Sequence, residues 1–104
     1  MLYNLHLIDD PVVSKHIRRE YLDRHLAYIA ANMGLIVVGG ALLAEDGQTR
    51  IGSAFILNVK DREVAEAFSR DEPFRKAGLY QSVSITRMRR GQWMPENGPD
   101  SPDG

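Results

Sequence analysis

Two kinds of apolar spacing follow one another along this chain, and their order is the feature that most constrains its fold. Near the start, Tyr3, Leu5 and Leu7 alternate with polar residues, which is the period of a half-buried strand. A long segment with helical spacing comes next, and strand-like and helical segments then alternate to residue 88. A chain with this order can place its helices against a sheet, but it cannot form an all-helical or an all-strand domain.

The expected elements have the order β-α-β-β-α-β. They cover residues 2–8, 11–33, 35–39, 51–59, 61–72 and 79–88. This order is typical of the ferredoxin-like α+β arrangement, in which a four-stranded antiparallel sheet carries two helices on one face. The other face then remains open to solvent, to a ligand or to another subunit.

The first helix is expected to begin at a cap on Asp10, with Pro11 at its first position. Its core-facing stripe is expected to contain Leu22, Leu26, Ile29 and Met33. At about 100° per residue, His25 lies roughly 60° from Leu22, at the edge of that stripe. His25 is therefore predicted at a boundary between core and solvent.

Local signals also mark the later elements. Asp61 can cap the second helix, and Glu72 before Pro73 should end it because a residue before proline disfavours helical geometry. Gly39-Gly40 and Gly52 indicate either bends or close backbone approach. Residues 91–104 contain three prolines and three glycines, so we expect an irregular tail beyond a domain of residues 1–90.

Composition excludes several classes of function. The net charge of -1 gives no bias toward nucleic acid or an anionic membrane. The absence of cysteine excludes disulfides and thiolate zinc sites, and it fits a cytoplasmic protein. The longest apolar stretches are too short to span a bilayer, and no secretory signal is visible. The histidines do not have metal-ligand spacing, and no nucleotide-binding or serine-nucleophile motif is present, so we expect neither metal nor cofactor.

One imidazole and one carboxylate are the minimum set for acid/base chemistry near neutral pH. His25 supplies the first, and Asp71 or Glu72 supplies the second. The alternative is that His25 is structural and both acids are solvated. Arg18, Arg19 and Arg24 could form a basic patch that holds a carboxylated substrate by bidentate hydrogen bonds, but the expected place for them is the exposed face of an amphipathic helix. Arg19 lies about 120° from His25 and is not an obvious partner for it.

Residues 1–90 resemble the YciI-like (YCII-related) family. The matching features are the Leu2-Tyr3 opening, Arg-x-x-x-x-x-His-Leu ending at Leu26, Gly39-Gly40-Ala41, Gly52-Ser53, Glu-Pro-Phe at 72–74 and Ala77-Gly78-Leu79-Tyr80. The resemblance implies a homodimer of the α+β barrel type, in which two sheets pack through their helix-free faces. It also implies a catalytic His-Asp pair. The histidine is His25, whereas the acid is Glu72 by its place before proline or Asp71 by residue type.

What the family implies about activity is a proton-transfer enzyme without a cofactor, of the lyase or isomerase kind, acting on a small cyclic molecule. Dehydrochlorination is one such reaction. Tyr21 and Tyr28 are expected to shape the substrate pocket, and His6 is expected to line the open sheet face. The competing interpretation is a non-catalytic module that binds a small ligand or another protein.

Overall fold

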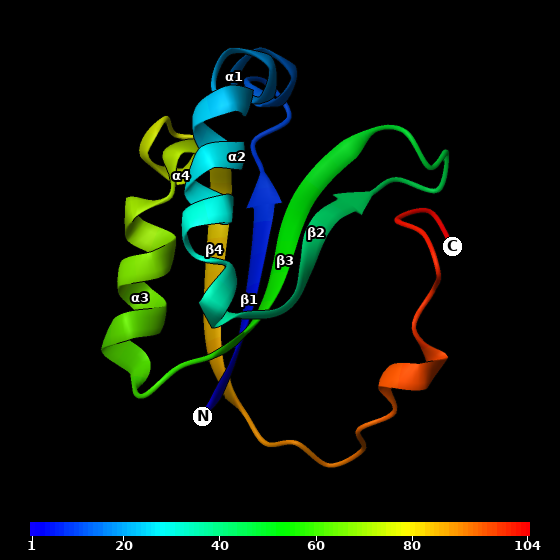
Figure 1. Ribbon diagram of the computed structural model, residues 1–104. Helices are drawn as coiled ribbons and strands as arrows, with labels where there is room; N and C mark the ends of the chain where they lie inside the picture. The colour runs from blue at the N-terminus through cyan, green and yellow to red at the C-terminus, as the bar shows by residue number, and fades with distance from the viewer.

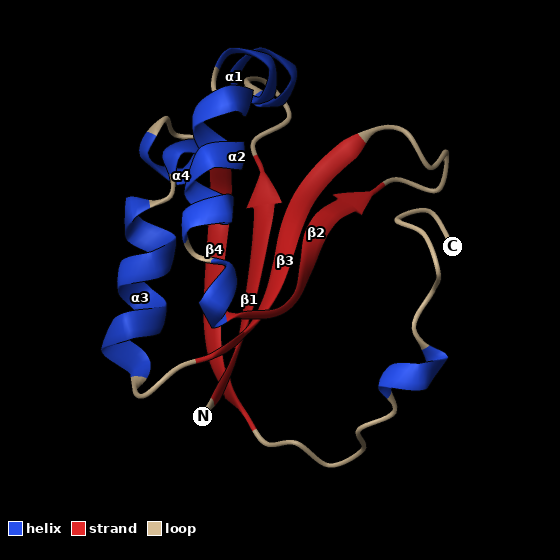
Figure 2. Cartoon of the chain, viewed as in Figure 1, coloured by secondary structure: helices blue, strands red, loops and turns tan.

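The computed structural model describes residues 1–104 and confirms the α+β, ferredoxin-like arrangement. The four strands form one antiparallel sheet in the order β2-β3-β1-β4. They are β1 (Leu2–Asp9), β2 (Ile36–Leu43), β3 (Arg50–Asn58) and β4 (Tyr80–Met88). The helices cover one face of this sheet and leave the other open (Figures 1 and 2).

The helical layer consists of four α-helices and a short 3-10 turn. They are α1 (Ser14–Glu20), α2 (Leu22–Ala31), η1 (Met33–Leu35), α3 (Arg62–Asp71) and α4 (Pro73–Lys76). The first helix was expected to begin at Pro11 and to be continuous, but it begins at Ser14 and is divided into α1 and α2. The Asp10 side chain accepts a hydrogen bond from the Val12 N–H at 3.0 Å and forms a turn, so α1 starts later. At Tyr21 the backbone leaves helical geometry (φ -103°, ψ 10°) and separates α1 from α2.

The main core lies between β1, β3 and the helices. Tyr3, Leu5 and Leu7 are buried, whereas Asn4 and His6 between them are exposed on the helix-free face, as the alternation predicts. Phe55 and Phe68 meet edge to face at 5.3 Å between ring centroids. Burial of this apolar surface holds the helices on the sheet.

Two glycines allow close approach inside the sheet. The strand expected at 35–39 continues through Gly39 and Gly40 to Leu43, so neither residue makes a bend. A Cβ on Gly39 would lie 2.4 Å from the Phe55 ring, and one on Gly52 would lie 2.4 Å from the Leu7 carbonyl oxygen. Close approach, rather than backbone freedom, is therefore the reason for glycine at these two positions.

The helical stripe is only partly buried. Ile29 packs against the core, but Leu22, Leu26 and Met33 are 45%, 54% and 59% exposed. The stripe pattern therefore predicted the helix correctly but not the burial of these three residues.

The last residues leave the sheet and loop away from the body of the molecule, with one short turn at Pro95–Asn97 (Figure 1). Trp93 and Met94 in this tail are more than half exposed. None of the helices combines the length and the apolar character needed to cross a membrane.

Candidate active site

The structure brings His25 of α2 next to Glu72, which lies between α3 and α4. The distance from His25 Nδ1 to Glu72 Oε1 is 2.5 Å, a short hydrogen bond. The two side chains are only 16% and 5% exposed. Partial burial weakens competition from water, so this contact is stronger than a surface pair of the same length.

Local sequence explains how Glu72 reaches this position. Pro73 disfavours helical geometry at Glu72, whose backbone is extended (φ -69°, ψ 131°), and α3 ends at Asp71 as expected. Pro73 then occupies the first turn of α4, and Glu72 becomes the N-cap of that helix. Its second oxygen, Oε2, accepts a hydrogen bond from the Arg75 backbone N–H at 3.2 Å. The carboxylate is thus fixed at both oxygens.

Phe74 orients the imidazole. Its ring stacks on His25 with 4.1 Å between centroids and 14° between planes, and its side chain is almost fully buried. Since Nδ1 faces Glu72, the ring presents Nε2 on its other side, where it makes no hydrogen bond within the protein. In the neutral form of His25, a carboxylate at Nδ1 favours the tautomer that carries its proton there, and this leaves a free lone pair on Nε2.

A cavity of about 440 Å³ adjoins the imidazole, between α2 and strands β2 and β3. Its volume is in the range of sites for small molecules. The lining residues are Arg18, Arg19, Leu22, His25, Leu26, Ile29, Gly39, Gly40, Ala41, Arg50, Ser53, Phe55 and Phe74. The three charged side chains among them are all arginines.

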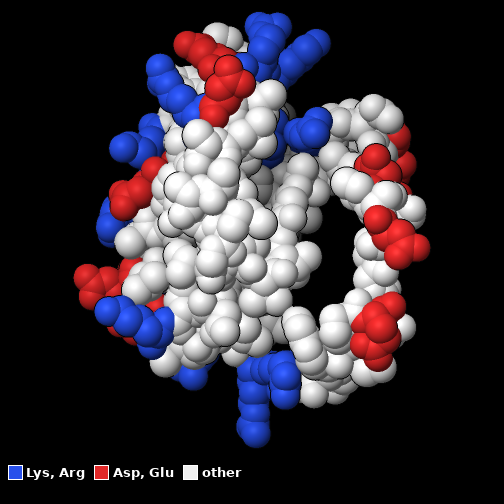
Figure 3. Space-filling view, viewed as in Figure 1, with Lys and Arg blue, Asp and Glu red and all other residues white.

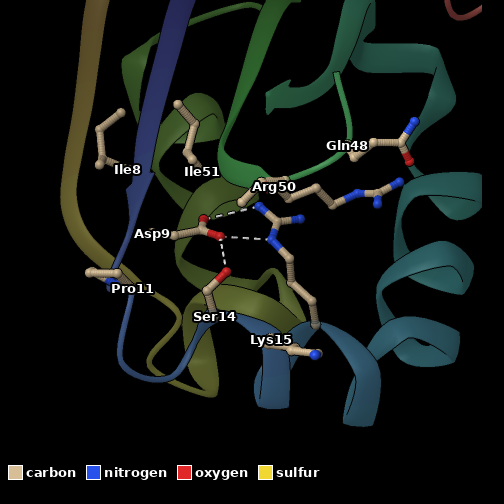
Figure 4. A pocket seen from close by; sticks show the side chains of 10 residues that line it. Ile8, Asp9, Pro11, Ser14, Lys15, Gln48, Arg50 and Ile51 are labelled. Atoms are coloured by element: carbon tan, nitrogen blue, oxygen red, sulfur yellow. Dashed lines mark hydrogen bonds and ion pairs between the residues drawn. The ribbon is translucent and has the colours of Figure 1, made fainter. Parts of the chain in front are cut away.

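Arg18 forms a partly buried network beside this cavity, so its expected position on the exposed helix face is wrong. Its Nε and Nη2 donate to the two Asp9 carboxylate oxygens at 2.8 and 3.0 Å, a bidentate pair. Nη2 also donates to the Gly52 carbonyl at 2.9 Å, and the Ser14 hydroxyl donates to Asp9 at 2.6 Å. Figure 4 shows the Ser14 hydroxyl and a guanidinium converging on the Asp9 carboxylate, with Arg50 extended nearby.

The spacing between Arg18 and His25 explains why both side chains lie beside the cavity. Arg18 precedes His25 by seven residues, which is close to two full helical turns and places both side chains on one side. The main-chain hydrogen bonds continue through Tyr21, from Tyr21 N–H to the Ile17 carbonyl and from His25 N–H to the Tyr21 carbonyl. The change of helix therefore preserves this alignment.

Tyr80 is a residue that sequence reasoning missed. Its hydroxyl lies 2.9 Å from the Ser53 hydroxyl, which in turn is 3.3 Å from Arg18 Nη2. Burial raises the pKa of Tyr80 to about 12, against the opposing effect of the Ser53 hydrogen bond, and the nearby Glu72 charge adds to the rise. Tyr80 is therefore a neutral hydroxyl near physiological pH. No pattern in the last strand distinguishes it from an ordinary core tyrosine.

The other predicted site residues lie away from the cavity. Asp71 is exposed and faces Arg70 at 3.4 Å, not His25. The Tyr28 hydroxyl donates to the Phe68 carbonyl at 2.9 Å, and burial is the main cause of its raised pKa. Tyr21 packs beside the buried cluster of Ile17, Phe74 and Leu79.

His6 faces the helix-free side of the sheet, opposite Ser84, and borders a hollow there that is separate from the His25 cavity. No three His, Asp or Glu side chains come together in a group that could hold a metal ion.

Comparison with known proteins identifies the family. The model of the YCII-related domain matches residues 1–89. A search of curated proteins finds no match. Among solved structures, 5-chloro-2-hydroxyhydroquinone dehydrochlorinase (TftG) from Burkholderia phenoliruptrix AC1100, in complex with 2,5-dihydroxybenzoquinone, is 28% identical with a TM-score of 0.78. The match covers 88% of this chain and 96% of that one.

A second solved structure is similar to this chain in fold. It comes from Bacteriodes thetaiotaomicron VPI-5482, and an antibiotic biosynthesis monooxygenase activity has been suggested for it. It is 15% identical with a TM-score of 0.50, over 90% of this chain and 94% of that one. At this identity the likeness concerns the fold alone. The family match spans nearly the whole folded region, and the chain belongs to the YCII-related family.

Proposed function

We propose that this member of the YCII-related family is a cofactor-independent acid/base enzyme that acts on a small cyclic organic molecule. The observation that carries the proposal is the His25–Glu72 pair, held at 2.5 Å on the wall of a cavity of about 440 Å³. A histidine oriented by a carboxylate, with its other nitrogen free, is the arrangement that general base catalysis needs. His25 and Glu72 are the proposed catalytic pair, and Asp71 has no part in it.

The proposed chemistry begins with transfer of a substrate proton to His25 Nε2. The imidazole becomes positively charged, and the Glu72 carboxylate at Nδ1 stabilises that charge while it holds the ring in place. Phe74 limits rotation of the ring, so little reorganisation accompanies the transfer. A positioned general base of this kind typically contributes about 100- to 10,000-fold to the rate.

The dehydrochlorinase relative suggests elimination as the specific reaction. In such a step the base removes a proton, and the electron pair of the broken bond moves into the ring system. The chloride then leaves with its own bonding pair. The products are the unsaturated ring compound and HCl, so the step requires no oxidant, reductant or metal. The same base can return the proton at another ring position, which would make the reaction an isomerisation.

We also propose that the active form is a homodimer. Val38 is 62% exposed on the helix-free face, where it lies opposite Ile56 in the sheet. In a monomer this apolar surface and the open sheet face stay in contact with water, whereas a second copy packed on them would bury that surface and stabilise the fold. Analytical ultracentrifugation of the full chain should give twice the mass of one chain, and a monomer at micromolar concentration would contradict the proposal.

Substitution of His25 tests the enzyme proposal directly. His25→Gln should lower the rate of chloride release from chlorinated hydroxyhydroquinones by about 100-fold or more. His16→Gln is the matched control, because His16 is an exposed histidine paired with Glu20 on α1. If His25→Gln lowered the melting temperature but left turnover unchanged, His25 would be structural, and a role in ligand binding would replace catalysis.

A further inference from the structure

Two cavities meet beside the proposed catalytic pair. Besides the cavity at His25, a larger one of about 710 Å³ lies between α1 and the hairpin that joins β2 to β3. Arg18 and Arg50 line both of them, so they form adjoining parts of one groove. Arg18 comes from the helical layer and Arg50 from the first residue of β3.

The charges around this groove are unbalanced. Its lining contains Lys15, Arg18, Arg19 and Arg50, whereas Asp9 is its one carboxylate and is already bound by Arg18 and Ser14. Lys15, Arg19 and Arg50 form no ion pair within the protein.

Lys and Arg atoms are visible in the hollow between the helices and the β2–β3 hairpin (Figure 3). A chain with a net charge of -1 thus concentrates positive charge at one concave site.

Arg18 is also preorganised as a donor. Its bonds to Asp9, Gly52 and Ser53 use Nε and Nη2, so Nη1 has no acceptor within the protein. No buried side-chain nitrogen or oxygen lacks a partner, which means that Nη1 is accessible from outside the protein. The guanidinium carbon lies 5.3 Å from the centre of the Phe74 ring, the same ring that His25 stacks on. Arg18 and His25 are therefore fixed against a common support.

We propose that the substrate is an anionic ring compound, a carboxylate, phenolate or enolate. Its charged oxygen is held by Arg18 Nη1 and by Arg50, while its acidic hydrogen faces His25. This inference rests on the proposed acid/base function and narrows its substrate class. A guanidinium that is already oriented loses little conformational entropy when it binds an oxyanion, and a charge-assisted hydrogen bond in a partly desolvated site is stronger than one in water.

Pairs of ring acids and their neutral amides test the inference without knowledge of the true substrate. Suitable pairs are benzoate with benzamide, 4-hydroxybenzoate with 4-hydroxybenzamide, and cinnamate with cinnamamide, each titrated into the full chain by NMR. We expect at least one acid to bind about 10-fold or more tightly than its amide, as one charge-assisted hydrogen bond would provide. The preference should weaken as salt is added.

Two arginine variants locate the preference. Arg50→Gln should remove most of the difference between acid and amide without changing amide binding, and it should fold because Arg50 is exposed and its side chain makes no hydrogen bond. Arg62→Gln, which removes an exposed arginine at the start of α3, should leave the ratio unchanged. Arg18→Lys keeps the charge but loses the fork, and it should also weaken acid binding.

The inference is overturned if no acid binds more tightly than its amide, or if Arg50→Gln and Arg62→Gln behave alike. Its failure can be told apart from failure of the enzyme proposal. If the preference for acids depends on Arg50 but His25→Gln leaves turnover unchanged, the anion-binding proposal stands and the acid/base proposal is wrong. Loss of turnover in His25→Gln without any acid preference would do the reverse.

Discussion

Replacing Glu72 by glutamine separates the two functions of this side chain with almost no change in its size. In the structure, Oε1 accepts from His25 Nδ1 at 2.5 Å and Oε2 accepts from the Arg75 N–H at 3.2 Å. A glutamine has one carbonyl oxygen and one NH2 group, so it can accept only one of these two hydrogen bonds. The residue is 3% exposed, and water cannot easily replace the contact that is lost.

Each orientation of the new amide has a calculable cost. If its carbonyl oxygen faces His25, its NH2 group meets the Arg75 N–H, and the helix cap, which contributes about 1 kcal/mol, is lost. If its carbonyl oxygen faces Arg75, its NH2 group faces Nδ1 and shifts the imidazole proton to Nε2. The base lone pair then points away from the cavity. Only the first orientation leaves a buried group, the Arg75 N–H, unsatisfied, and this costs about 1–3 kcal/mol of unfolding free energy. The second orientation keeps both hydrogen bonds and changes the tautomer of His25 instead.

The tautomer of His25 can be read without a substrate. Long-range proton–nitrogen correlation spectra distinguish an imidazole that carries its proton on Nδ1 from one that carries it on Nε2. Wild-type protein should show the first form when His25 is neutral, and Glu72→Gln should show a clear increase in the second. Urea unfolding gives the stability change, and turnover should fall by about 100-fold or more because the base is misdirected.

Asp71→Asn provides the matched control. It removes the same charge one residue earlier, but Asp71 is exposed and contacts only Arg70, so its stability should change by less than about 0.5 kcal/mol. The reasoning is refuted if Glu72→Gln keeps both the wild-type tautomer and the wild-type stability. It is also refuted if Asp71→Asn causes the same loss as Glu72→Gln.

Two further predictions concern the surroundings of the site. Gly52→Ala would place a Cβ 2.4 Å from the Leu7 carbonyl oxygen, so it should push β1 away from β3 and lower the unfolding free energy in urea by about 1–3 kcal/mol. Gly40→Ala is the control, because a Cβ there meets nothing within 4 Å. Equal unfolding midpoints for the two variants would contradict the packing argument. The pKa of Tyr80 is about 12 in the folded protein and about 10 in an unfolded chain. The stability that this difference contributes should therefore be fully present below pH 10 and should disappear as the pH rises toward 12. An absorbance titration of tyrosinate should show an ionisation near pH 12 that Tyr80→Phe removes, beside the raised but separate ionisation of Tyr28. A wild-type titration curve without the step that Tyr80→Phe removes would refute the assignment.

The fold could be predicted because its signals are local and periodic. Alternation in residues 2–8 places Tyr3 and Leu5 in the core, and the Asp61 side chain accepts from the Val64 N–H at 3.0 Å as a helix cap should. Such patterns depend only on neighbours in the chain. The exposure of Leu22 and Leu26 could not be predicted in the same way, because it depends on which residues lie opposite them in space. In the single chain both are about half exposed, although the helical stripe predicts that they are buried.

The candidate site was predictable only in part, for the same physical reason. His25 and the pair Asp71–Glu72 follow from residue type and position, but the choice between the two acids depends on side-chain direction. Arg18 was expected in solvent because a charged residue on a helix is usually exposed. Its burial depends on Asp9, which comes from a strand and supplies the opposite charge that makes a buried guanidinium tolerable.

Glu72-Pro73-Phe74 joins the fold to the site. From the sequence alone, Asp71 and Glu72 lie at the C-terminal end of a helix, where their charges interact unfavourably with the negative end of the helix dipole. In the structure Pro73 ends α3 and starts α4, so Glu72 becomes the cap at the favourable end of the next helix. The same turn brings the Phe74 ring to 4.1 Å from the imidazole of His25. A proline that breaks one helix thus directs both the carboxylate and the aromatic ring toward the histidine, which is why Glu72 and not Asp71 faces it.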